Sequence, residues 1–140
     1  MSIEENKALV RRYFRDLADN TNPGAAGEIL APDYAGHLPG TPGPLDRAGV
    51  AQFVGGFHAA FPGITHTVEN LVAEGDRVAA RITVRGTNRG EFMGLPATGR
   101  EIALDAVNFF TVRDGRIAEQ RVIFDNLALM QQLGLAPAAG

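Results

Sequence analysis

The apolar residues of this chain repeat with a helical spacing up to residue 61 and then with a spacing typical of strands. One helical face in the first half consists of Leu9, Val10, Tyr13, Phe14 and Leu17, and another of Val50, Phe53, Val54, Phe57 and Phe61. In the second half, "EIALDAVNFFTV" alternates between two faces. Helices followed by strands predict an α+β fold.

Breaker residues divide the first half into three helices. "DNTNPG" ends the first helix, a short helix is expected around Ala25–Leu30, and a third begins near Asp46 and stops at "FPG". The segment between the second and third helices, "APDYAGHLPGTPGPLD", contains four prolines and three glycines. We therefore predict that it forms a loop.

Two hairpins are expected in the second half. One pair of strands is joined by "EGD" and the other by "RDGR", with the loop "EFMGLPATG" between the pairs. A short helix, Leu127–Leu133, follows the last strand. We expect residues 1–140 to form one domain, in which about four antiparallel strands bend over three helices and enclose a conical cavity.

Composition excludes several kinds of site. The chain has no cysteine, Ser2 is its single serine, and His37, His58 and His66 lack metal-ligand spacing, so we expect no thiol or serine nucleophile and no metal. The net charge of −3 gives no reason to expect nucleic acid binding. With no P-loop, signal peptide or membrane span predicted, we expect a cytoplasmic protein without a cofactor.

Two amides are expected on the inner face of the sheet. Asn108 interrupts an apolar face of "EIALDAVNFFTV", and Gln120 joins it if Ala118, Val122 and Phe124 point inward. A buried amide without a partner costs roughly 1–3 kcal/mol, so each needs a structural or a ligand partner. Both possibilities stay open, as does an exposed position for Gln120.

Further candidates lie in the loops. His37 could exchange protons near neutral pH, or simply bond to the backbone. Tyr34 could contact a ligand or fill the core beneath its loop, and Phe92, Met93 and Leu95 could line a cavity mouth or merely pack. We expect His58 and His66 to be structural or exposed.

Asp125 lies at the junction between the last strand and the last helix. An aspartate in this place caps a helix by accepting from free backbone N–H groups. A carboxylate held in this way is a weak general base. Asp125 is therefore predicted to be a cap, either alone or with an added contact to substrate.

The chain resembles the SnoaL-like polyketide cyclases of the nuclear-transport-factor-2-like superfamily. The resemblance rests on "EGDRVAARITVRGTNRGEFMGLPATGREI", "VRDGRIAEQRVIFDNLALMQQLG" and the opening "ENKALVRRYF" with "APDYAGH", and so covers nearly the whole chain. It implies a cone-shaped fold with a deep pocket, a homodimer, and a catalytic aspartate on the last strand with polar groups on its neighbour. Aligned through "DGRI" and "QLG", the aspartate position falls on Val122 and the polar pair on Ala106 and Asn108.

The resemblance thus predicts a cofactor-free cyclase that acts on a small hydrophobic molecule by confinement and polarisation. The predicted catalytic residues are His37, Asn108, Gln120 and Asp125. The predicted lining of the pocket is Tyr34, Phe57, Phe92, Met93, Leu95, Ala106, Phe110, Val122 and Phe124. The alternatives are a binding protein of the same fold without turnover, or a hydrolase or isomerase of the superfamily.

Overall fold

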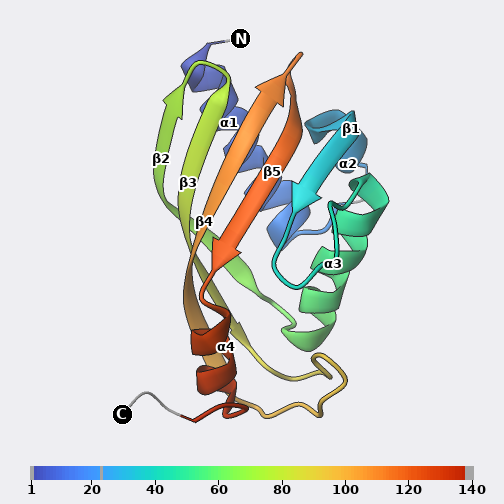
Figure 1. The fold of residues 1–140 in the computed structure, drawn as a ribbon, viewed down its shortest axis with the longest axis vertical. Helices are drawn as coiled ribbons and strands as arrows, with labels where there is room; N and C mark the ends of the chain where they lie inside the picture. The colour runs from blue at the N-terminus through green and yellow to red at the C-terminus, as the bar shows by residue number, and fades with distance from the viewer. Residues whose placement is uncertain (1, 23, 138–140) are drawn as a thin grey trace.

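A computed structural model describes residues 2–22 and 24–137 of the chain. It contains five helical segments and five strands (Figure 1): α1 (Ile3–Arg12), η1 (Tyr13–Asp19), α2 (Ala26–Ile29), β1 (Leu30–His37), α3 (Arg47–Ala60), β2 (Thr65–Glu74), β3 (Arg77–Thr87), β4 (Glu101–Arg113), β5 (Arg116–Phe124) and α4 (Asn126–Leu133). The strands form one sheet in the order β1-β5-β4-β3-β2. Both predicted hairpins and the α+β class are confirmed.

The first strand was not predicted. Residues 30–37 form β1, which pairs in parallel with β5, where the sequence predicted a helix end and a loop. Proline is tolerated in a strand at the edge of a sheet, and β1 is an edge strand, so Pro32 does not prevent pairing. Tyr34 and Gly36 are buried while Pro32 and Asp33 are exposed, so β1 turns one face to the interior.

The helices cover the inner face of the sheet and leave the other face open. In Figure 1, α1 crosses behind the strands, α3 stands beside β1, and α4 lies below the end of β5. Val10, Tyr13 and Phe14 belong to one core cluster with Val78 and Phe110. No helix in the described part of the chain is long and apolar enough to cross a membrane.

The predicted faces of β4 are confirmed. Ile102, Leu104, Ala106, Asn108, Phe110 and Val112 are all buried, whereas Asp105 is exposed. The register between β4 and β5 shifts by one residue: Thr111 pairs with Glu119, whereas the next residue, Val112, pairs with Ile117. Ala118 is thus an extra residue in β5, a bulge. Beyond the bulge, Gln120 points inward and is 1% exposed.

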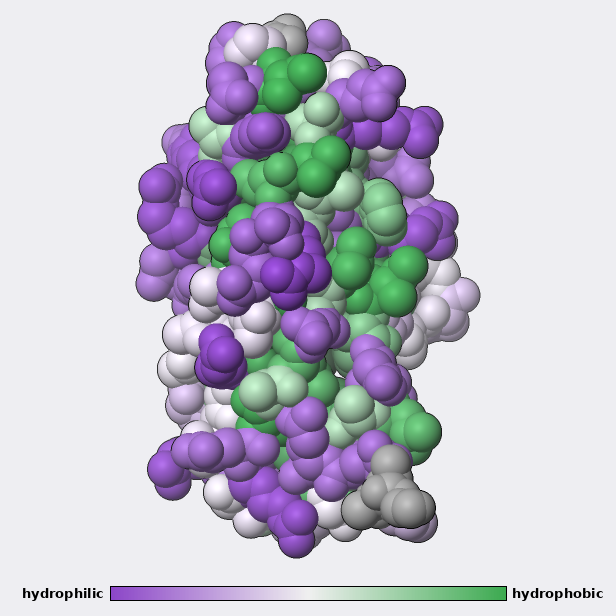
Figure 2. All heavy atoms as spheres, turned by 90° about the vertical axis from the view of Figure 1, so that its left-hand side faces the viewer, coloured by the Kyte–Doolittle hydropathy of each residue, from purple (hydrophilic) through white to green (hydrophobic). Residues whose placement is uncertain are grey.

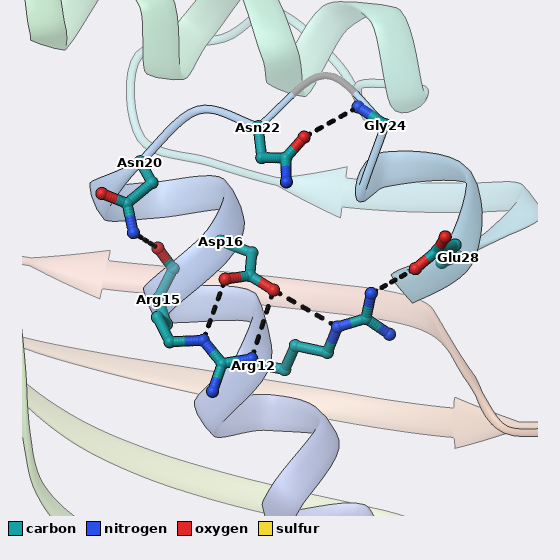
Figure 3. Close-up of polar contacts among 7 residues, drawn as sticks. All are labelled: Arg12, Arg15, Asp16, Asn20, Asn22, Gly24 and Glu28. Carbon is teal, nitrogen blue, oxygen red and sulfur yellow. Dashed lines mark hydrogen bonds and ion pairs between the residues drawn. The ribbon is translucent and has the colours of Figure 1, made fainter.

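A π-helical turn, η1, continues α1 and is tied to α2 by charged side chains. Asp16 accepts hydrogen bonds from Arg12 (3.3 Å) and Arg15 (2.9 Å), and Arg12 also pairs with Glu28 of α2 (Figure 3). The bond from Arg15, followed by that from Arg12, lowers the pKa of Asp16. These contacts hold η1 and α2 at one side of the interior, where both contribute to a cavity described below.

The outer face of the sheet carries apolar side chains. Val72, Phe109 and Ile123 are 67%, 51% and 55% exposed. Figure 2 shows the side of the molecule on which β2 and β3 lie, where green apolar patches are scattered from top to bottom and are interrupted by purple polar groups.

Candidate active site

Four polar side chains meet in the interior between η1, β1, β4 and β5. Tyr34 donates its hydroxyl proton to Oε1 of Gln120 at 2.6 Å. Nε2 of Gln120 donates to the hydroxyl oxygen of Tyr13 at 3.0 Å and to Oδ1 of Asn108 at 2.9 Å. Tyr13, Tyr34, Asn108 and Gln120, called the interior quartet below, are each 4% exposed or less. Gln120 is its hub, because both its oxygen and its nitrogen are engaged.

Backbone register brings the quartet together. Gln120 lies opposite Gly36 of β1 and next to Phe110 of β4, while Asn108 lies opposite Val122. A Cβ at Gly36 would overlap the Tyr34 hydroxyl, so a larger residue there would push the phenol away from Gln120. Glycine in "DYAGH" therefore has a packing role that its place in a predicted loop did not indicate.

Both tyrosines of the quartet are neutral at physiological pH. Burial raises the pKa of Tyr13 to about 12, although the hydrogen bond from Gln120 acts in the opposite direction. Burial also raises the pKa of Tyr34, with the nearby Tyr13 as a second cause. The quartet is thus a set of neutral donors and acceptors, with no charged group among its members.

Two donors of the quartet are unused by the protein. The Tyr13 hydroxyl accepts from Gln120, and its own proton has no acceptor among the described residues. The amide nitrogen of Asn108 also has no acceptor among the described residues, whereas its Oδ1 accepts from Nε2 of Gln120. Oδ1 of Asn6 is the one fully enclosed side-chain polar atom without a partner in the described chain, so the Asn108 nitrogen must reach accessible space. The quartet therefore holds two N–H or O–H donors, on Tyr13 and Asn108, that no described protein group uses.

Two apolar cavities flank α3. The first, of about 300 Å³, is here called the phenylalanine cavity and is lined by Pro39, Gly40, Phe53, Phe57, Phe92, Met93, Phe124, Asn126 and Leu129. The second, of about 280 Å³, is here called the α2–α3 cavity and is lined by Tyr13, Leu17, Thr21, Asn22, Ala26, Leu30, Arg47, Val50, Ala51, Val54, Gly55 and His58. Each is near the lower end of the range for small-molecule sites. Instead of one deep cone, the described residues form these two smaller apolar spaces on either side of α3, besides more open hollows on the surface.

The cavities approach the quartet from different sides. Tyr13 itself lines the α2–α3 cavity. Phe124, in the phenylalanine cavity, lies opposite Ala106, and Asn108 is the next inward-facing residue of β4, roughly 7 Å further along the strand. A molecule in the α2–α3 cavity would therefore contact Tyr13 directly, whereas Asn108 lies in the sheet beyond the lining of the phenylalanine cavity.

A sequence profile described as SnoaL-like polyketide cyclase matches residues 8–133. The chain belongs to the SnoaL-like polyketide cyclase family. Its relative DnrD, the aklanonic acid methyl ester cyclase of Streptomyces peucetius, is 32% identical over 133 residues, which cover 94% of this chain and 90% of DnrD.

Solved structures of the same fold agree with this assignment. IdmH, a candidate polyketide cyclase from Streptomyces antibioticus, is 37% identical with a TM-score of 0.82, over 92% of this chain and 98% of IdmH. AclR, a candidate hydroxylase from Streptomyces galilaeus, is 29% identical with a TM-score of 0.86, over 99% of this chain and 87% of AclR. Proteins similar to this SnoaL-like chain are thus associated with more than one reaction.

The structure brings together some of the residues that the sequence singled out in this SnoaL-like chain. Asn108, Gln120 and Tyr34 share the interior quartet. Phe57, Phe92, Met93 and Phe124 line the phenylalanine cavity, and Ala106 is buried opposite Phe124. Their roles toward a substrate stay predictions.

Other candidates lie elsewhere. Neighbouring residues of a strand point to opposite faces of the sheet. Gly36 lies opposite the inward-facing Gln120, so His37, which lies opposite Arg121, points to the outer face. There its Nε2 is 3.6 Å from Oε1 of Glu119. Phe110 packs edge-on against Tyr13, with 5.4 Å between ring centroids, and lies in the core. Leu95 is 43% exposed. Val122 lies opposite Asn108 and packs against the core cluster, and it also borders a groove beside His37 and Leu38. His37 is thus on a strand rather than in a loop, it lines neither of the cavities that flank α3, and its catalytic role stays a prediction.

Asp125 caps α4, as its sequence position predicts. Its Oδ1 accepts from the backbone N–H of Ala128 at 2.9 Å, and the residue is exposed. The neighbouring Asn126, rather than Asp125, lines the phenylalanine cavity. The helix-cap role is confirmed, and this arrangement gives Asp125 no position inside the site.

Sequence reasoning missed the part of Tyr13 in the site. Its place in the helical stripe with Leu9, Val10 and Leu17 indicated a core residue, and it is indeed buried. The available signal was that a buried phenol needs a partner, which applied to Tyr13 as much as to Tyr34. His58 and His66 are structural: Nε2 of His58 donates to the Ala18 carbonyl oxygen at 2.7 Å, and His66 bonds to Asp19 at 2.8 Å.

Proposed function

We propose that this chain is a cofactor-independent cyclase that closes a ring in a hydrophobic, polyketide-type intermediate. The observation that carries the proposal is the pair of unused donors, Tyr13 O–H and the Asn108 amide, fixed around Gln120, with Tyr13 in the wall of the apolar α2–α3 cavity. Membership of the SnoaL-like family and the name of DnrD support the class of reaction.

Ring closure needs a folded substrate more than it needs a strong base. Holding the two reacting ends together supplies roughly 7–11 kcal/mol in favourable cases. In a 1,3-dicarbonyl substrate the enol carbon attacks a carbonyl carbon, the carbonyl oxygen gains a proton, and the enol oxygen releases one. Donors from Tyr13 and Asn108 would stabilise the negative charge that develops on the carbonyl oxygen.

Gln120 has a positioning role in this mechanism. Its nitrogen uses both hydrogens, on Tyr13 and Asn108, and its oxygen accepts from Tyr34. These bonds orient the Tyr13 hydroxyl and the Asn108 amide before a substrate arrives. Preorganised donors of this kind are worth about 10²–10³-fold each in rate.

The activity is tested with aklanonic acid methyl ester, the compound in the name of DnrD, and with the corresponding free acid. Tyr13→Phe and Asn108→Leu each remove one donor and are expected to lower kcat roughly 10²-fold. Asn70→Leu, at an exposed amide bonded to Arg81, is the matched control and should leave kcat unchanged. Equal rates for all four proteins would reject the proposed site.

A binding protein without turnover is the second candidate. The observation that favours it is that Gln120 is fully engaged within the protein, so the quartet also stabilises the fold without a ligand. Thermal stabilisation by the methyl ester without any product would support this candidate instead of the cyclase.

We also propose that two copies pair through the outer face of the sheet. Exposed Val72, Phe109 and Ile123 support this, because apolar side chains gather at stable interfaces. Phe109→Lys should convert a dimer to a monomer in light scattering, whereas Ile3→Lys, a matched change at another exposed apolar residue, should not. A monomeric wild-type chain would contradict this proposal.

A further inference from the structure

We propose that the α2–α3 cavity binds a carboxylate and that Arg47 holds it, so that the substrate is a hydrophobic acid. The inference rests on the proposed function, because it names the class of substrate for the same interior site. It also identifies Arg47 as the residue that would distinguish an acid from its ester.

Arg47 is fixed at the cavity wall with unused donors. Its Nε donates to the carbonyl oxygens of Leu30 (3.2 Å) and Ala31 (3.1 Å), and one Nη2 hydrogen goes to Leu30 (2.7 Å). A guanidinium has five N–H donors in a planar fork. Both hydrogens of Nη1 and one of Nη2 are left without acceptors among the described residues. The backbone carbonyls thus fix the orientation of the guanidinium, and the edge formed by Nη1 and Nη2 keeps free N–H groups. Such an edge suits a carboxylate, which accepts from two nitrogens at once.

The charge of Arg47 is not neutralised in the described part of the chain. No aspartate or glutamate of residues 2–22 or 24–137 lies within ion-pair distance of it, although Arg12, Arg15, Arg81 and Arg113 all have such partners. Arg47 is also the first residue of α3, where the positive end of the helix dipole disfavours a cation. That end already has a carboxylate, because Asp46 caps α3 by accepting from the Gly49 N–H at 2.8 Å, so the dipole does not add to the need for an anion at Arg47. Arg47 thus supplies an unpaired positive charge at the wall of an apolar cavity.

The remaining wall indicates what the carboxylate is attached to. Leu17, Ala26, Leu30, Val50 and Val54 give the cavity an apolar lining. His58 also lines the cavity, and its Nε2 donates to the Ala18 carbonyl oxygen at 2.7 Å. Arg47 is the one charged side chain in the lining. The expected ligand is therefore apolar along its body, with a single anionic end.

The same cavity connects the carboxylate site to the quartet. Tyr13 lines it together with Arg47, and the Tyr13 hydroxyl is 3.0 Å from Nε2 of Gln120. A substrate anchored at Arg47 would have its next polar group toward Tyr13. The carboxylate contact would then set which carbonyl of the substrate receives the donors of the quartet.

The test measures binding of 2-naphthoate and of its methyl ester, which share an apolar body and differ in charge. Isothermal titration should show roughly ten- to hundred-fold tighter binding of the acid, the range for a hydrogen bond to a charged group. Arg47→Gln, which keeps an N–H donor for the Leu30 and Ala31 carbonyls, should make the two affinities equal. Val54→Phe fills the cavity and should weaken both. Arg85→Gln, at an exposed arginine of β3, is the matched control and should keep the preference for the acid.

Three results would overturn the proposal: equal or undetectable binding of acid and ester to the wild-type chain, an acid preference that survives Arg47→Gln, or an acid affinity unaffected by Val54→Phe. If Arg47→Gln does not fold, the proposal is tested by the ratio of acid to ester affinity in the wild-type chain and by the loss of acid affinity in Val54→Phe. Naphthoate does not cyclise, so failure of ring closure leaves this result standing. Conversely, an active cyclase that binds acid and ester alike overturns only the carboxylate site.

Discussion

Replacing Gln120 by leucine should reveal how far the interior quartet acts as a unit. The change removes the acceptor of Tyr34 O–H and the donor to Asn108 Oδ1, both deeply buried. Each stranded group costs about 1–3 kcal/mol, and the greater apolar burial of leucine offsets part of that. We expect a net loss of about 2–4 kcal/mol in the free energy of unfolding, measured by urea denaturation followed by circular dichroism.

The sharper prediction concerns Tyr34→Phe in the two backgrounds. In the wild-type chain this change strands Oε1 of Gln120 and should cost about 1–2 kcal/mol. In the Gln120→Leu background it removes a stranded hydroxyl and should be neutral or stabilising, which gives an interaction energy of about 1–3 kcal/mol. The same change in an Asn70→Leu background should cost as much as in the wild type. If Tyr34→Phe costs the same with and without Gln120, the quartet is not a cooperative unit and the reasoning fails.

Alkaline titration and the cap of α4 give two further tests. The chain has two tyrosines and no tryptophan, so phenolate absorbance reports Tyr13 and Tyr34 alone. Burial raises the pKa of Tyr13 from 10.0 to about 12, so its contribution to stability is complete below pH 10 and is lost as the pH rises through 12. Phenolate should therefore appear together with unfolding; absorbance that rises near pH 10 in a folded chain would show exposed phenols. Asp125→Ala should lower stability by about 1 kcal/mol and leave ring closure unchanged, and a large loss of turnover in a folded variant would give Asp125 a role in catalysis.

The sequence indicated the sheet hairpins and α3 well because their signals are local. Asp46 caps α3 by accepting from the Gly49 N–H at 2.8 Å, and the alternation in β4 is kept along its whole length. Strand β1 was missed because its pairing with β5 is parallel and far away in sequence, and because Pro32 is acceptable only at an edge that the sequence does not reveal.

The site was predictable in its residue types but not in its connections. An amide on an apolar strand face needs a partner, and this rule found Asn108 and Gln120. That Tyr13 of η1 and Tyr34 of β1 supply the partners depends on the packing of four elements. The placement of His37 in a loop was wrong for a related reason: residues 30–37 form a strand, and alternation puts His37 on the side opposite Gly36 and Gln120.

The central claim is that neutral donors and confinement, without an ionising group, accelerate ring closure. It is tested by the ratio of the enzymatic to the uncatalysed cyclisation rate of aklanonic acid methyl ester, measured from about pH 5 to about pH 9 in the same buffers. Amides do not titrate and the pKa of Tyr13 is about 12, so the ratio should be constant across that range. A ratio that changes about ten-fold per pH unit over part of the range would show that an acid or base acts in the site and would contradict the account.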